Sequence, residues 1–123
     1  MCKLVQLYDD NSSVLIADIK KPYIVNAVNS LKSCSLIDEI YLFGSCLESR
    51  CTDTSDIDIA LVGKVAYEEF LSSKEYAEVA DKIYSFGLSP SDFQDYDILY
   101  FNSTESNDTQ IYREAIKGAK VYG

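Results

Sequence analysis

Residues 40–62 read IYLFGSCLESRCTDTSDIDIALV, and this stretch decides the fold. Its first four residues are apolar and run into Gly44-Ser45, which predicts a buried strand over Ile40 to Phe43 that ends in a special turn. After ten intervening residues the pattern alternates over Asp56 to Val62, which predicts a second strand. One face of this strand is apolar, and the other face carries Asp56, Asp58 and Ala60.

The two aspartates of the second strand lie about 7 Å apart, because side chains two residues apart in a strand project to the same side. A site that keeps both carboxylates ionised favours a divalent cation. Their hard oxygens suit Mg²⁺, which commonly takes its remaining ligands from water and nucleotide phosphates. The simpler interpretation is that both aspartates lie at a solvated strand edge. The presence of Gly44-Ser45 upstream, with ten intervening residues, favours the metal site instead.

Gly44-Ser45 is suited to binding phosphate. A residue without Cβ lets backbone N–H groups and a neighbouring hydroxyl approach an anion closely. The ordinary roles of a turn glycine and a helix N-cap serine are compatible with this function.

A third carboxylate stands on the predicted strand Tyr96 to Phe101, where Asp97 interrupts an apolar run. An aspartate in such a run is costly unless it is paired or bound to a metal. Asp95 has the same strand parity and is the alternative third acid. Three acids beside a phosphate site are typical of metal-assisted phosphoryl or nucleotidyl transfer, in which Asp97 would also accept a proton from the attacking hydroxyl.

The remaining elements follow from periodicity and turn residues. Residues Ser45 to Ser55 predict a short helical turn plus loop, and Val65 to Phe86 predicts one amphipathic helix, or one broken near Ser72-Ser73 and stopped by Gly87 and Pro90. The other expected elements are a hairpin of Lys3 to Tyr8 and Val14 to Ile19 around the turn residues Asp9 to Ser13, helices over Pro22 to Ser33 and Thr104 to Lys117, and a final strand over Ala119 to Tyr122.

Composition excludes several classes of protein. The 20 acidic and 11 basic residues give a net charge of −9, which repels nucleic acids and anionic membranes. The absence of histidine excludes Ser-His-Asp, Cys-His and HExxH chemistry. No apolar run approaches a membrane span or a secretion signal, so the chain is expected in the cytoplasm, with its four cysteines as reduced thiols rather than as disulfides or metal ligands.

Gly44-Ser45, ten residues and Asp56-Ile57-Asp58 resemble the GS-x10-DxD signature of polymerase-β-like nucleotidyltransferases, and in particular of the minimal nucleotidyltransferase group. The likeness extends over about residues 20–122 and includes Asp97 as the third acid and the closing helix and strand. It implies an α/β (α+β) fold with a small mixed sheet flanked by helices. The chain would then be one domain over residues 1–123, with residues 1–19 as an N-terminal hairpin extension.

The resemblance also implies site residues and cofactors. Asp56 and Asp58 would bind two Mg²⁺ ions, and Asp97 would bind the catalytic ion and help to deprotonate the acceptor. Gly44 and Ser45 would contact the triphosphate of ATP or another NTP. Family members commonly carry a basic residue three positions after the motif serine, where this chain has Glu48. Triphosphate binding is therefore expected either to be weaker or to use Arg50, Lys64 or another cation instead.

The resemblance leaves three functional hypotheses. The leading one is transfer of AMP from ATP to a hydroxyl on a protein partner, such as the HEPN-domain toxin that minimal nucleotidyltransferases often neutralise as antitoxins. An acidic surface suits a protein partner better than a nucleic acid or a membrane. The second is nucleotidyl transfer to a small, antibiotic-type molecule. The third is an antitoxin that only binds its partner, with Glu48 as a sign of lost triphosphate binding.

Overall fold

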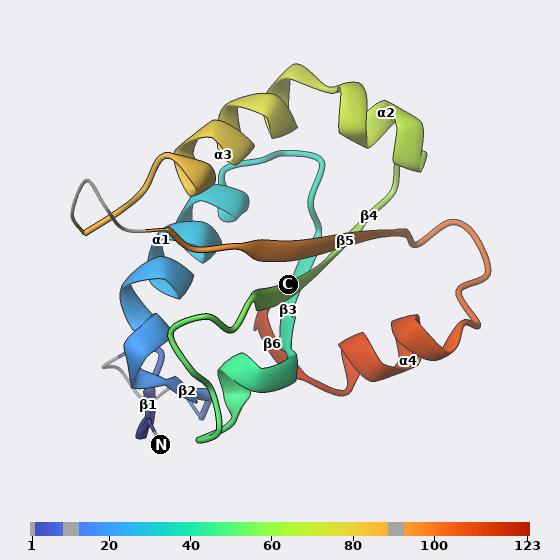
Figure 1. The fold of residues 1–123 in the computed structure, drawn as a ribbon. Helices are drawn as coiled ribbons and strands as arrows, with labels where there is room; N and C mark the ends of the chain where they lie inside the picture. The colour runs from blue at the N-terminus through green and yellow to red at the C-terminus, as the bar shows by residue number, and fades with distance from the viewer. Residues whose placement is uncertain (1, 9–12, 89–92) are drawn as a thin grey trace.

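The computed structural model describes residues 2–8, 13–88 and 93–123. The described residues form a four-stranded sheet in the order β5-β4-β3-β6 and a separate two-stranded sheet, β1-β2 (Figure 1). The strands are β1 (Leu4–Gln6), β2 (Leu15–Ala17), β3 (Glu39–Phe43), β4 (Ile57–Gly63), β5 (Tyr96–Asn102) and β6 (Ala119–Tyr122). The helices are η1 (Asp18–Lys20), α1 (Lys21–Lys32), η2 (Gly44–Leu47), α2 (Tyr67–Ser72), α3 (Lys74–Tyr84) and α4 (Gln110–Ile116).

The register of the large sheet joins the predicted site residues. β4 pairs antiparallel with β3 and parallel with β5, and β6 pairs antiparallel with the other edge of β3. A parallel pair needs a long crossover, which the chain supplies with α2 and α3. Phe43 at the end of β3 is opposite Asp58, and Asp58 is opposite Asp97. The mixed sheet with flanking helices confirms the expected fold class.

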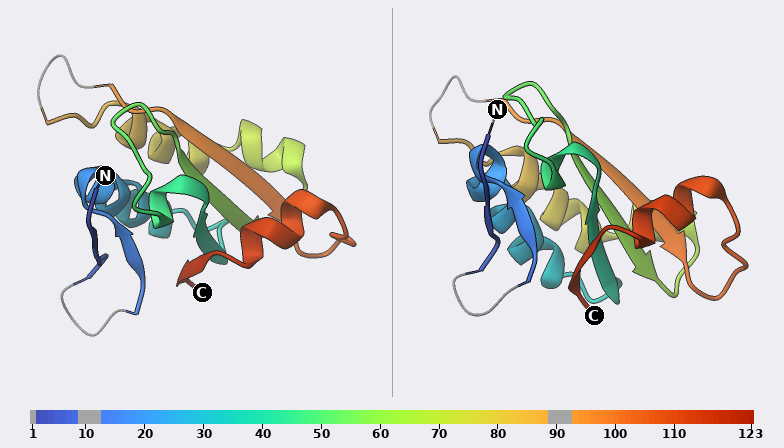
Figure 2. Two further views of the ribbon diagram at one scale, coloured as in Figure 1. Left: turned by 60° about the horizontal axis from the view of Figure 1, so that its bottom comes forward. Right: turned by 90° about the horizontal axis from the view of Figure 1, so that it is seen from below.

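One face of the sheet makes the main core. Ile57, Ile59 and Leu61 of β4 are fully buried with the apolar residues of α1, α3 and the centre of β3. The hairpin contributes Leu7 and Ile16 to the same core. Figures 1 and 2 show α1, α2 and α3 on this side of the sheet and the hairpin beside α1. The alternation over residues 57–61 therefore predicts the buried face of β4 correctly.

The opposite face is only half covered. α4 lies across it (Figure 2). Tyr112 of this helix packs edge-on against Phe101 of β5, with ring centroids 4.9 Å apart. On this face, where α4 contacts β4, Ala60 and Val62 are buried although they share it with the aspartates. Beyond the reach of α4 the same face carries Asp58, which is half-buried, and Asp97, which is exposed.

Of the two stated possibilities for the 65–86 region, the structure confirms the broken one. The break is at Ser73, whose hydroxyl accepts from the Tyr76 amide at 3.2 Å and caps α3. The last helix differs from its predicted bounds. α4 begins at Gln110 rather than at Thr104, because the Thr109 side chain caps its first turn and Asn102 Oδ1 holds the Thr104 amide in a turn. The expected turn residues 9–12, the Pro90 stop and Asp92 lie outside the described residues.

The four cysteines are free thiols, and three of them are buried. Among residues 2–8, 13–88 and 93–123, no helix combines the length and the apolar character that crossing a membrane requires.

Candidate active site

The second and third acids of the predicted site are neighbours on adjacent strands. Asp58 and Asp97 pair in the parallel register of β4 and β5, so their side chains leave the same face of the sheet. Asp56 lies just before β4 and is exposed. Burial, together with the negative charges of Asp97 and Asp56, raises the pKa of Asp58 from 3.8 to about 6. The charges of Asp97 and Asp56 therefore act on Asp58, which places the three carboxylates within electrostatic reach of one another.

The Gly-Ser turn lies directly against the second acid. Gly44 has φ of +78°, a conformation that side chains disfavour, and it opens the helical turn η2 after the extended Phe43. A Cβ added at Gly44 would come 2.1 Å from Oδ2 of Asp58. The turn thus brings its exposed backbone beside the Asp58 carboxylate, and only glycine permits both the backbone conformation and the contact.

Gly44→Ala should therefore damage the site as well as the fold. The left-handed backbone conformation alone costs about 1–2 kcal/mol for alanine, and the new methyl displaces the Asp58 carboxylate. If the chain transfers nucleotides, we expect the rate to fall about tenfold through this misplacement. Urea unfolding and a transfer assay measure the two effects separately.

Gly63→Ala is the matched control. Its Cβ would lie 2.3 Å from the Leu36 carbonyl oxygen at the far end of β4, so this variant should also lose stability. Its activity per folded molecule should stay at the wild-type level. Equal losses of activity in both variants would contradict the assignment of Gly44 to the site.

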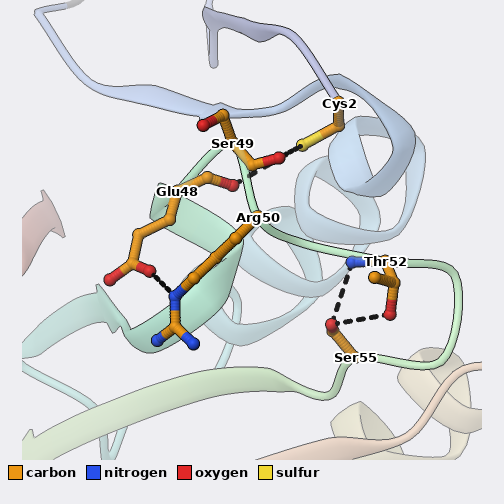
Figure 3. Close-up of polar contacts among 6 residues, drawn as sticks. All are labelled: Cys2, Glu48, Ser49, Arg50, Thr52 and Ser55. Carbon is orange, nitrogen blue, oxygen red and sulfur yellow. Dashed lines mark hydrogen bonds and ion pairs between the residues drawn. The ribbon is translucent and has the colours of Figure 1, made fainter.

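The loop between the turn and the acids is held at two points (Figure 3). The backbone carbonyl of Ser49 accepts from the Cys2 amide at 3.1 Å and from the Cys2 thiol at 3.2 Å, which ties the loop to the N-terminal hairpin. Ser55 Oγ accepts from the Thr52 amide at 3.0 Å and lies 3.2 Å from the Thr52 hydroxyl. The approach of the chain to Asp56 is therefore set by a hydrogen-bonded turn.

The cations expected to bind triphosphate are not gathered at the acids. The Arg50 side chain is 73% exposed and forms an ion pair with Glu48 (Figure 3). Glu48 thus both replaces the usual basic residue and engages the nearest cation. Lys64 follows the opposite end of β4, about 20 Å along the strand from Asp58 at 3.3 Å per residue.

Lys20, which was not among the predicted site residues, is buried beside the loop that precedes Asp56 and β4. It is 1% exposed and is the one fully buried charged side chain among the described residues. Its Nζ donates to the Asp53 carbonyl at 3.1 Å and to Oε1 of Gln94 at 2.6 Å. Burial lowers the pKa of Lys20, and the negative charges of nearby Asp53 and Asp56 oppose that shift. No sequence signal separates Lys20 from the adjacent Lys21, because lysines before a helix are ordinarily exposed.

The residues present fit magnesium and a nucleotide. Mg²⁺ is usually held by one or two carboxylates, together with water and substrate phosphates, rather than by a complete protein cage. Asp58 and Asp97 supply paired hard oxygens, and Asp56 adds a third close by. Among the described residues, no three histidine, cysteine, aspartate or glutamate side chains are already arranged to hold a metal.

The fold is a mixed sheet that carries acids on adjacent strands, with a Gly-Ser turn against one of them. The family model described as Polymerase beta, Nucleotidyltransferase matches residues 26–122, and the chain belongs to this family. The match includes Gly44, Ser45, Asp56, Asp58 and Asp97 and leaves out the N-terminal hairpin. A comparison with curated proteins finds no match.

Proposed function

We propose that the chain is a magnesium-dependent nucleotidyltransferase of the minimal type, which transfers AMP from ATP to a hydroxyl group of a protein. The observation that carries the proposal is the position of Asp58, which lies between the Gly44 turn on one side and Asp97 on the other. This arrangement would bring the triphosphate, the metal ligands and a proton acceptor within reach of one another.

Each residue has a distinct role in the proposed site. Asp56 and Asp58 hold the metal ions, and Asp97 binds the catalytic ion as a further ligand. Bound Mg²⁺ would neutralise negative charge on the phosphates as it develops during transfer. The exposed amides of the Gly44-Ser45 turn and the Ser45 hydroxyl bind phosphate oxygens. Arg50 binds a phosphate oxygen only when its ion pair with Glu48 is broken.

The proposed transfer forms one bond and breaks another. The acceptor hydroxyl oxygen bonds to the α-phosphorus of ATP, and its proton passes to the Asp97 carboxylate. The bond from the α-phosphorus to the bridging oxygen breaks, and pyrophosphate leaves with that electron pair. Asp97 is exposed and therefore accessible to an incoming hydroxyl.

A protein is the favoured acceptor. The net charge of −9 repels nucleic acids, and it allows a complementary basic protein surface to approach quickly. A HEPN-domain toxin, neutralised by modification in the cytoplasm where ATP is supplied, is the partner we propose.

The experiment is transfer of label from α-³²P-ATP. We expect label on a HEPN-domain protein encoded beside this chain, with Mg²⁺ present, and no label in EDTA. ATP labelled at the γ-phosphate is the matched control, because AMP transfer leaves that label on pyrophosphate. Binding of the partner without label transfer would overturn the enzymatic proposal and favour an antitoxin that acts by binding alone.

A further inference from the structure

We propose that Lys20 and Gln94 are positioning residues that hold the starts of β4 and β5 at a fixed spacing, so that Asp56, Asp58 and Asp97 converge on one metal site. This inference rests on the proposed function for its purpose. We call the pair the Lys20–Gln94 clip.

Gln94 joins the segments that lead into the two acid-bearing strands. Its Nε2 donates to the Ser55 carbonyl at 3.0 Å and to the Asp95 carbonyl at 2.7 Å. Ser55 directly precedes Asp56, and Asp95 precedes Asp97 by two residues. The side-chain amide of Gln94 therefore sets the separation of the two backbone segments just before Asp56 and Asp97.

The clip continues the hydrogen bonding of the sheet. The Ile57 amide donates to the Asp95 carbonyl at 3.1 Å and makes the first backbone bond between the two strands. The Asp95 carbonyl thus accepts from both Ile57 and Gln94. Because Ile57 lies between Asp56 and Asp58, a loosened first bond would move both acids relative to Asp97.

Lys20 fixes Gln94 from the side of the helical layer. Its Nζ binds Oε1 of Gln94 and so orients the amide with its nitrogen toward the two carbonyls. The same Nζ binds the Asp53 carbonyl, which ties down the loop before β4. Lys20 immediately precedes α1, so the clip anchors the acids to the helix that packs beneath the sheet.

The buried Lys20 ammonium is compensated by its surroundings. Moving a charged group out of water is costly unless it is hydrogen-bonded and lies near opposite charge. Lys20 meets two oxygens, and Asp53 and Asp56 are near enough to act on its charge. Lys20→Met would leave both oxygens without this donor and remove the one buried positive charge beside the acids.

The first test is amide hydrogen exchange in the metal-free protein. We expect Lys20→Met and Gln94→Leu to speed exchange at the Ile57 amide about tenfold, the effect of losing one or two hydrogen bonds. The Ser103 amide, which donates to Gly63 at 2.7 Å beyond the other end of the strand pair, should keep its wild-type rate. Lys74→Met at an exposed position of α3 is the control for losing a lysine.

The second test is magnesium affinity, followed as the Mg²⁺ concentration that half-maximally stabilises the protein against heat. We expect this concentration to rise about tenfold in both clip variants and to stay unchanged in Lys74→Met. If Lys20→Met fails to fold, Gln94→Glu keeps the acceptor for Lys20 but loses the donors to both carbonyls, and it should give the same two results.

The outcomes separate the clip from the proposed function. Unchanged exchange at Ile57 in the clip variants would overturn the clip, whatever the activity. Faster exchange with unchanged Mg²⁺ affinity would overturn its positioning role and leave a structural one. A wild-type protein that is not stabilised by Mg²⁺, with or without ATP, would overturn the proposed function, and with it the purpose assigned to the clip.

Discussion

Asp58→Asn should abolish nucleotidyl transfer and at the same time stabilise the metal-free protein at pH 7.5. A loss of about 10³-fold is expected because Asp58 is the acid nearest both to the turn and to Asp97, and charge stabilisation at such sites contributes factors of this size. The stabilisation follows from the electrostatics of the site, because an ionised Asp58 is half-buried beside two other carboxylates.

The sign of the pH effect follows from the raised pKa of Asp58. Between about pH 4 and pH 6 the folded protein holds a proton that the unfolded chain has released, because the pKa is about 6 in the fold and ordinarily 3.8. The free energy of unfolding therefore falls as the pH rises through this window. After allowance for solvent screening, the ionised group costs about 1–2 kcal/mol above pH 6.

Urea unfolding in EDTA at pH 4 and pH 7.5 measures this effect. Asp58→Asn should match the wild type at the lower pH and exceed its stability at the higher pH. Asp81→Asn, at an exposed position of α3, makes the same chemical change away from the site and should leave the difference between the two pH values unaltered. If the difference in unfolding free energy between the wild type and Asp58→Asn were the same at both pH values, that result would contradict the environment assigned to this carboxylate.

Asp97→Asn should lower transfer about 10²–10³-fold, whereas Asp95→Asn should change it by no more than about threefold. Loss of a general base alone accounts for factors of 10²–10⁴. The parallel register places Asp97 beside Asp58, while Asp95 lies before the strand and contributes its backbone carbonyl to Ile57 and Gln94. The asparagine substitution keeps that carbonyl in place.

Initial rates at saturating ATP and Mg²⁺ compare the two variants. Both aspartates are exposed and carry the same substitution, so each serves as the control for the other. A larger loss in Asp95→Asn would reassign the third acid to Asp95. Full activity in both variants would remove β5 from the catalytic site.

The spacing of the motif predicts the centre of this site because local patterns determine it. The apolar run before Gly44 is a property of one strand, and the alternation after Asp56 is a property of another. A loop of ten residues can join these two strands in only a few arrangements. The choice between Asp97 and Asp95 depends on the pairing register of β4 and β5, which no local pattern encodes. The register pairs Asp58 with Asp97, and activity remains to be measured.

Other features depend on tertiary contacts and escape prediction for that reason. Ala60 is buried only because α4 crosses the second face of the sheet, and α4 itself starts late because Thr109 is its cap. Lys20 lies next to another lysine and before a proline, in a context typical of a solvated helix start. Its burial arises from two acceptors, at Asp53 and Gln94, that are distant in the sequence.

The N-terminal hairpin lies outside the family match, yet Cys2 binds the loop that separates the two halves of the motif. Natural variation in those first residues would alter the support of the loop without touching any carboxylate. Domain boundaries for expression or for chimaeras should accordingly begin ahead of Cys2.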